Sequence, residues 1–357
     1  MVDKEIQEGY ILKKRSFKME IPGNFLTSGM GVLPHTDLEK GLELAMSVDI
    51  PFWPQLPKVR YEEDMYAQVA HRFPGSNINV KKRKVEFNQA TFYEDLETYL
   101  FKVDDPHFFQ LTPEASLVFH LFLEKDLANF PAIRGQMEGP ISFGLVVHDE
   151  NDQPILYIDE VRQILFDFVA RKVNAQLDQL TEKNPNAFMF IDEPGLQFIF
   201  SAMAGYGDIQ AKDEMNQMFS QIKGKRGIHL CGNPGWDFLL DLDIDILSFN
   251  AYDRGDVFVG YIDRIKSFLD RGGVIAWGIV PVVYEDFNKE SFESLYKKII
   301  GILDNLATKG IGRDLLRERS LLMPATCSLV NPDGDATVEN GYKMLKEISE
   351  KLKEEYR

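Results

Sequence analysis

The sequence predicts an α/β protein, a single (β/α)₈ barrel, on two observations. Short apolar runs that end in small or polar residues alternate with segments of helical periodicity. The runs are apolar throughout rather than at every second residue, which is typical of parallel strands covered by helices on both sides. Eight such runs favour a closed barrel over an open doubly wound sheet. The predicted strands are 24–31, 48–55, 139–147, 187–194, 227–232, 244–251, 273–280 and 321–329.

The segments between the strands read as amphipathic helices, with apolar residues three and four apart and charges on the other face. They are 37–47, 158–183, 259–272, 289–310 and 338–357.

One region, 57–135, does not fit a simple strand–helix unit. It carries the basic stretch "VKKRK" at 80–84, a candidate hairpin, and a helical pattern at 112–130. We interpret it as a long excursion between strands two and three that covers the barrel mouth or forms a subunit contact, for example in a homodimer. The predicted organisation is one domain over 1–357, with strands one and two in 24–56, the excursion in 57–135 and strands three to eight in 136–357.

Composition excludes several classes of partner. The net charge of −16 over 357 residues argues against nucleic acid and against anionic membranes. Two cysteines cannot form a disulfide framework, the charged first residues contain no apolar signal core, and no apolar run is long enough for a bilayer. We therefore expect a cytoplasmic protein with reduced thiols.

Polar and thiol side chains gather where predicted strands end. A barrel builds its active site at the C-terminal ends of its strands. The fourth, fifth, sixth and eighth predicted strands end in Asp192 and Glu193, in His229 and Cys231, in Asn250 and Asp253, and in Cys327.

The His-x-Cys pattern indicates a metal site. Side chains two apart on a strand point to the same side, so His229 and Cys231 could bind one metal, with Cys327 from the last strand as a third ligand. Two thiolates and one imidazole with an open position are a catalytic zinc set. The alternative is structural: a buried cysteine acts as a small hydrophobe and a strand histidine as a core residue.

Adjacent carboxylates at Asp192 and Glu193 form a second candidate catalytic feature. One of them could bind a substrate ammonium group, or act as a general acid or base. Alternatively, the pair supports the N-terminus of the following helix.

The glycine-rich turn "LTSGMGVLPHT" at 26–36 could let a substrate approach the backbone. It lacks the dinucleotide-binding pattern. Candidate substrate contacts here are Ser28, Gly29 and His35, and Trp53 and Gln55 at the end of strand two could line the same pocket. The alternatives are a solvated histidine and a tryptophan in the core.

Taken together, these motifs resemble the catalytic barrel of cobalamin-independent methionine synthase, within the superfamily that also holds uroporphyrinogen decarboxylase and the methylcobamide:thiol methyltransferases. The resemblance covers most of the chain from residue 24 onward. It lies in "TSGMGVLPHT" (27–36), "MEGPISF" (137–143), "IDEP" (191–194), "HLCGN" (229–233), "DIDILSFNA" (243–251) and "LLMPATCSLVNPDGD" (321–335).

The resemblance implies a (β/α)₈ fold and a catalytic zinc on His229, Cys231 and Cys327. It places Asp192 where the family binds the amino group of homocysteine. The family's fourth ligand, a glutamate, aligns with Asn250, which would then face the substrate, and Asp253 is the nearby acidic replacement. Zinc would hold a substrate thiol as a nucleophilic thiolate.

The function expected from the resemblance is zinc-dependent transfer of a methyl group from a methylcorrinoid, or a similar donor, to a thiol such as homocysteine. The corrinoid would come free or on a separate protein. The first loop has none of the arginines that the decarboxylase branch uses there. Two alternatives stay open: a decarboxylase or lyase on the same barrel, and a non-catalytic ligand-binding barrel.

Overall fold

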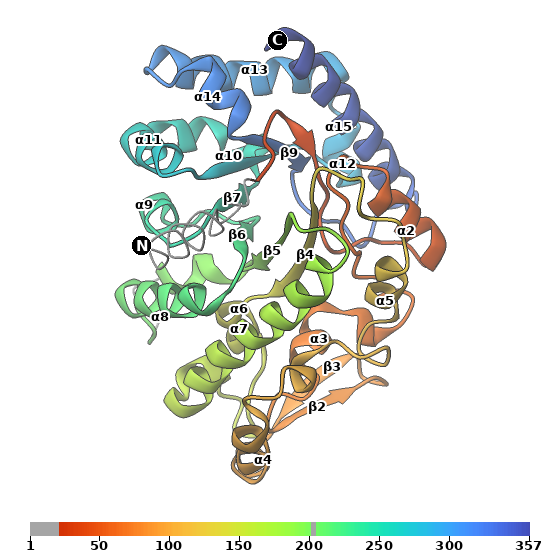
Figure 1. Ribbon diagram of the computed structural model, residues 1–357, viewed down its shortest axis with the longest axis vertical. Coiled ribbons are helices and arrows are strands. Elements are labelled where there is room, and N and C mark those ends of the chain that lie inside the picture. The colour runs from red at the N-terminus through yellow and green to blue at the C-terminus, as the bar shows by residue number, and fades with distance from the viewer. Residues whose placement is uncertain (1–20, 201–204) are drawn as a thin grey trace, which may run out of the picture.

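The computed structural model describes residues 21–200 and 205–357, and its centre is a curled parallel sheet (Figure 1). The sheet has seven strands in the order β1-β9-β8-β7-β6-β5-β4, and every neighbouring pair is parallel. The strands are β1 Leu26–Thr27, β4 Ile133–Glu138, β5 Ala187–Asp192, β6 Lys225–Leu230, β7 Ile246–Phe249, β8 Val274–Val280 and β9 Ser320–Pro324.

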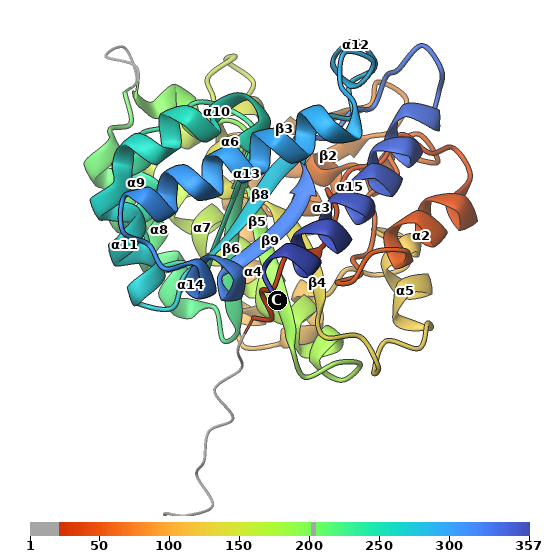
Figure 2. The same ribbon diagram turned by 90° about the horizontal axis from the view of Figure 1, so that it is seen from above.

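Helices cover the convex face of this sheet (Figures 1 and 2), and the strands are buried along nearly their whole length, as their composition predicted. The predicted helices correspond to α2 Leu38–Met46, α7 Asp159–Thr181, α11 Ile262–Asp270, α13 Phe292–Thr308 and α15 Ala336–Glu355. The remaining outer helices are α8 Asp208–Gln221, α9 Trp236–Leu240, α10 Ala251–Phe258, α12 Tyr284–Phe287 and α14 Arg313–Glu318. Across the described parts of the chain, no helix is both long and apolar enough to cross a bilayer.

The concave side of the sheet holds its own apolar cluster. Phe188 and Phe190 from β5 pack there against Ile246 from β7 and Leu321 and Met323 from β9. Because side chains alternate along a strand, the next inward position on β5 after Phe190 is Asp192. The apolar cluster therefore forms the floor beneath the polar strand ends.

The predicted second strand, 48–55, is not a regular strand. It makes two isolated parallel bridges, Phe52 with Arg134 and Val32 with Gln55. Ile50 N donates to Thr27 O at 2.9 Å on one side, and Arg134 N donates to the carbonyl of Pro51 at 2.9 Å on the other. Proline has no N–H, so Pro51 and Pro54 interrupt a continuous ladder. This irregular segment thus lies between the two edge strands, β1 and β4.

The third strand was predicted in the wrong place. Residues 139–147 begin with the N-cap Gly139 and contain helix α6, Pro140–Val146, while the strand is the preceding β4. Proline suits the first turn of a helix because its missing N–H would have no helical partner there. The excursion therefore ends before residue 133.

The excursion contains the predicted hairpin, β2 Ser76–Asn79 paired with β3 Lys84–Phe87, with the basic stretch at its turn. Helices α3 Met65–Ala70, α4 Gln89–Lys102 and α5 Leu117–Leu123 complete it. Phe73 contacts Phe143 of α6 and Phe168 of α7 edge to face, with ring centroids 6.0 and 5.3 Å apart. Most of the excursion thus packs against the outer helices, and the hairpin and α4 project from one end of the molecule (Figure 1).

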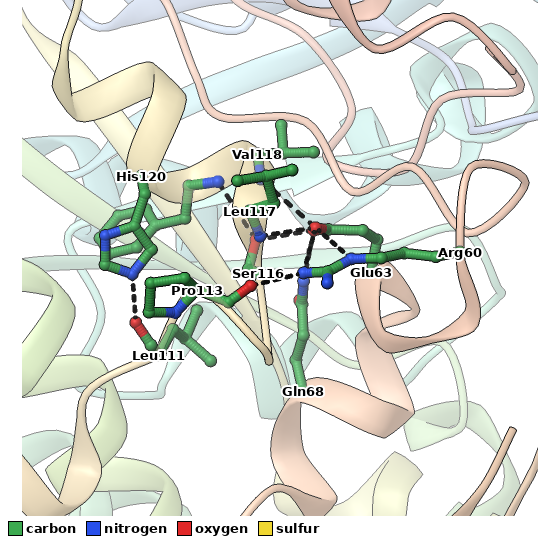
Figure 3. A network of polar contacts seen from close by, with 10 residues as sticks. Arg60, Glu63, Gln68, Leu111, Pro113, Ser116, Leu117, Val118 and His120 are labelled. Atoms are coloured by element: carbon green, nitrogen blue, oxygen red, sulfur yellow. Dashed lines mark hydrogen bonds and ion pairs between the residues drawn. The ribbon is translucent and has the colours of Figure 1, made fainter.

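A buried glutamate joins two parts of the excursion (Figure 3). The carboxylate of Glu63, which is fully buried, accepts hydrogen bonds from Ser116 Oγ and Leu117 N, both at 2.7 Å. Arg60 donates to it from Nη2 at 3.0 Å and from Nε at 3.2 Å. These bonds hold the N-terminus of α5 against the 3₁₀ turn Tyr61–Glu63.

Candidate functional site

A small pocket of about 70 Å³ lies at the C-terminal ends of the strands. It contains both cysteines and His229, whereas a larger surface hollow of about 730 Å³ beside Arg317 and Lys353 contains neither thiol nor imidazole. The pocket lining is Met30, Gly31, Val32, Met65, Arg134, Phe190, Asp192, Pro194, His229, Cys231, Met323 and Cys327.

His229 and Cys231 are in direct contact. Nε2 of His229 lies 3.1 Å from Sγ of Cys231, and Nδ1 lies 2.9 Å from Oγ of Ser248 on the next strand. Burial, together with the charge of Arg134, lowers the pKa of His229 to about 3, so the ring is neutral. A neutral imidazole whose second nitrogen is fixed by a hydrogen bond is the form that binds metals.

The two thiols approach the pocket from different strands. Cys231 follows β6 directly, and Thr326 Oγ1 donates to its sulfur at 3.2 Å. Cys327 lies in the loop after β9; the residue is exposed, but the neighbouring pocket groups desolvate its sulfur. Desolvation raises the pKa of Cys327 to about 12 and also raises that of Cys231, so both are neutral thiols without a bound cation. Both are free of disulfides.

His229 and Cys231 can be compared with the dimensions of a zinc site. In tetrahedral geometry a histidine nitrogen and a thiolate sulfur lie about 3.6 Å apart, from bond lengths of about 2.1 and 2.3 Å. The observed 3.1 Å between His229 and Cys231 is close to this separation. Among residues 21–200 and 205–357, no three His, Cys, Asp or Glu side chains already form a metal-binding group. The two donors would therefore need to separate by about 0.5 Å to share a zinc ion, and the third, Cys327, lines the same pocket.

Asp192 lines this pocket and lies in one row with the histidine. Strand register places Glu138, Asp192, His229 and Ser248 side by side on four adjacent strands. Burial raises the pKa of Asp192 to about 7, although the charge of Arg134 opposes the shift. The carboxyl can therefore hold or release a proton near neutral pH.

Glu193 points elsewhere. Its buried carboxylate accepts from Ile141 N at 3.0 Å and Ser142 N at 2.8 Å, so it caps the N-terminus of α6. Desolvation raises its pKa to about 7 against these hydrogen bonds. The structure therefore separates the two adjacent carboxylates, with Asp192 in the pocket and Glu193 supporting a helix. The sequence also allowed the acidic pair to support the helix that follows it in the chain. The helix that Glu193 caps precedes Glu193 instead.

Ser28 and Gly29 lie behind the pocket wall. Ser28 Oγ donates to Ile50 O at 2.9 Å and accepts from Arg134 Nε at 3.1 Å, and the Gly29 carbonyl accepts from the same guanidinium. A side chain at Gly29 would collide with the ring of Phe52. These two residues position Arg134 rather than line the pocket themselves.

His35, Trp53 and Gln55 are fully buried and do not line the pocket. Trp53 Nε1 donates to Gln176 at 3.2 Å, and Gln55 Nε2 donates to Gln68 at 2.7 Å. The His35 ring lies 3.6 Å from a carboxylate oxygen of Glu339 on α15. In the structure these side chains pack against outer elements, as the core alternative described for Trp53.

Asn250 and Asp253 form a helix cap. Asn250 Oδ1 accepts from Asp253 N at 3.1 Å, and its Nδ2 donates to the Asp253 carboxylate at 2.8 Å. Asn250 is the N-cap of α10, and neither residue lines the pocket. The structure therefore does not bring Asp253 to the thiols.

Two charged residues on β4 were missed from the sequence: Arg134, which lines the pocket, and Glu138, which lies next to Asp192 in the strand register. Their strand reads "IRGQME", and its polar residues at every second position conceal it from a search for apolar runs. That alternation was itself the available signal, because three inward-facing polar side chains in a buried strand indicate a polar cavity.

Glu138 is fully buried, and among the described residues no donor makes a hydrogen bond of normal geometry to either carboxyl oxygen, although the Tyr66 hydroxyl is near enough to act on it. Burial, with the charges of Glu193 and Asp192 adding to it, raises its pKa well above the usual value, although the Tyr66 hydroxyl counteracts part of the shift. Glu138 therefore favours its protonated form more than an ordinary glutamate does, beside Asp192 in the row of strand ends.

Comparison with protein-family profiles and with curated protein sequences found no match. Among solved structures, the chain is similar to a methyltransferase from Methanosarcina mazei, with a TM-score of 0.55, 15% identity and 95% of each chain covered. It also matches a B12-independent methionine synthase from Shewanella sp. W3-18-1, with a TM-score of 0.43, 14% identity, and 71% of this chain and 67% of that chain covered. The first likeness supports the α/β barrel-like fold along nearly the whole chain.

Proposed function

We propose that this chain is a zinc-dependent methyltransferase that methylates a small thiol at the pocket formed by the ends of β5, β6 and β9. The observation that carries the proposal is the contact of His229 with Cys231 in a pocket that Cys327 also lines. The chain's likeness in fold to a methyltransferase supports it. In this proposal, segment 48–55 serves as the eighth strand of a closed barrel.

His229, Cys231 and Cys327 would hold the zinc ion, which supplies a positive charge that keeps a substrate thiol deprotonated. Ser248 fixes the imidazole through Nδ1, so that Nε2 stays available as a ligand. Thr326 orients the Cys231 sulfur through its hydroxyl. These two residues are positioning residues.

Asp192 would contact the substrate beside the metal, as a proton acceptor or as partner of an ammonium group. The transfer is balanced as a displacement at the methyl carbon. The sulfur–carbon bond forms while the bond between methyl and donor breaks, the electron pair stays on the donor, and the thiol proton leaves to solvent. A methylcorrinoid, free or on a partner protein, suits this chemistry because the reduced corrinoid accepts that electron pair.

The test uses zinc-loaded protein with methylcobalamin and homocysteine. We expect the thioether by mass spectrometry and the matching loss of methylcobalamin absorbance, both abolished in Cys231→Ser and retained in Ser220→Ala, an exposed control. If the protein binds zinc and thiol but transfers no methyl group, the donor proposed here is wrong. If it binds neither, a lyase or a non-catalytic ligand-binding barrel replaces this proposal.

A further inference from the structure

Arg134 places a buried positive charge in the pocket wall. It is 1% exposed, comes from the interior of β4 and lines the same pocket as His229 and the thiols. Its hydrogen-bond partners within the described ranges are all neutral: Ser28 Oγ at 3.1 Å, Gln136 Oε1 at 3.0 Å and the Gly29 carbonyl. The guanidinium therefore has no carboxylate bonded to it.

The guanidinium is held rigidly. Its central carbon lies 4.8 Å from the ring centroid of Phe52 and 5.0 Å from that of Phe190. The three neutral acceptors occupy three of the five N–H groups of an arginine, which leaves two for a ligand. A fixed fork with free N–H groups is suited to a carboxylate or another planar anion.

The charge balance of the pocket also favours an anion. Burial lowers the pKa of Arg134 only to about 10, so the group stays charged at neutral pH. Asp192 feels its charge, but burial raises the pKa of that carboxyl to about 7, and burial also raises the pKa of Glu138, so both carboxyls are poor counter-ions. A buried ion without a bonded counter-ion is unfavourable, and an anionic ligand would remove that imbalance.

We propose that Arg134 binds the anionic end of the substrate, which is a short thiol carrying a carboxylate or similar anion. The thiol half of this inference rests on the proposed function, whereas the anion site does not. The pocket has a volume of only about 70 Å³. The substrate's sulfur, bound beside Cys231, and its anionic group, bound at Arg134, can therefore be only a few atoms apart. Arg134 then selects among thiols by charge.

The test is calorimetric titration of zinc-loaded protein with 3-mercaptopropionate and with the neutral 3-mercaptopropanol. We expect the anionic thiol to bind about tenfold tighter or more, as a charge-assisted hydrogen bond implies. Arg134→Gln should lose this preference while its affinity for the neutral thiol stays within about threefold. Arg134→Lys, which keeps the charge but not the fork, should retain part of the preference and serves if the glutamine variant does not fold.

Propionate, which has no thiol, separates the two proposals. If it binds in wild type but not in Arg134→Gln while no thiol binds more tightly than propionate, the anion site stands and the thiol chemistry fails. If both thiols bind wild type equally, or if Arg134→Gln keeps the preference, the anion site is overturned while thiol binding stands.

Discussion

Glu63 and Glu138 are both fully buried, yet their surroundings are opposite. Glu63, in the excursion, accepts hydrogen bonds from Arg60, Ser116 and the backbone of α5 (Figure 3). Glu138, at the end of β4, accepts no hydrogen bond of normal geometry on either oxygen from residues 21–200 and 205–357, and the Tyr66 hydroxyl acts on it only from outside that geometry. The first carboxylate connects two segments of the fold, and the second is an unsatisfied polar group beside a pocket.

The difference distinguishes a buried carboxylate that stabilises the fold from one that belongs to a functional site. A buried charge with a full set of donors stabilises the arrangement of those donors. A buried carboxyl left without donors is unfavourable for stability and is typical of sites where a ligand or a proton completes the arrangement. Glu138 and Arg134, a buried cation without a bonded carboxylate, both belong to β4 and face the pocket side of the sheet.

The largest expected effect on stability comes from removing Glu63, the carboxylate whose hydrogen bonds are satisfied. Glu63→Ala should lower the free energy of unfolding by about 3–5 kcal/mol, because Arg60 loses its carboxylate and the donors at the start of α5 lose their acceptor. Urea unfolding measures it, with the neighbouring Glu62→Ala as control, expected within about 0.5 kcal/mol of wild type. A loss below about 1 kcal/mol for Glu63→Ala would show that the network does not stabilise the excursion.

Glu138→Gln should act in the other direction, because the native state holds a proton on this carboxyl that the unfolded chain releases above the ordinary glutamate value of 4.5. Above that pH the native state binds more protons, so stability falls as pH rises, by up to about 1.4 kcal/mol per pH unit until the raised pKa is passed. The glutamine variant lacks this loss and should be about 1–3 kcal/mol more stable than wild type at pH 8.

Unfolding at pH 5 and pH 8 measures this effect, with Glu62→Gln as the matched control. Asp192 and Glu193 remain in both proteins, so the difference between the two pH profiles reports Glu138 together with its coupling to these two carboxyls. Identical pH profiles for wild type and Glu138→Gln would contradict the account of an unsatisfied carboxyl.

The smallest expected effect concerns the cap at α10. Asn250→Ala should cost about 1 kcal/mol of stability, because it removes the side chain that accepts from Asp253 N. Zinc retention should not change, since neither Asn250 nor Asp253 lines the pocket. Equilibrium dialysis against zinc checks this expectation, and a drop in zinc affinity for Asn250→Ala would instead assign the pair to the metal site.

The strands that the sequence predicted correctly, such as β5 with Phe188 and Phe190 on its inward face, carry few charged residues. Strand β4 was misplaced because its inward positions carry Arg134, Gln136 and Glu138, so it lacks the apolar run that marks its neighbours. The apolar stretch after it is helical, and part of the reason lies 52 residues away in the capping carboxylate of Glu193. Such a long-range contact cannot be read from local pattern.

The candidate site shows the same division. Barrel topology predicted that one pocket would contain His229, Cys231, Cys327 and Asp192, because the C-terminal ends of the strands converge. That Asp192 and Glu193 point to opposite sides follows from the alternation of side chains along a strand, but the helix that Glu193 caps does not. The role of Arg134 likewise depends on acceptors from a distant loop, including the Gly29 carbonyl.

The central claim, a zinc ion held by His229, Cys231 and Cys327, is tested most directly by the zinc content of purified protein after dialysis. We measure metal per chain for wild type, Cys231→Ser, Cys327→Ser and the exposed control Ser220→Ala. The account predicts about one zinc per chain in wild type and control, and a loss of affinity of about 100-fold or more in either cysteine variant. Wild-type protein without zinc, or cysteine variants that retain zinc as wild type does, would contradict it.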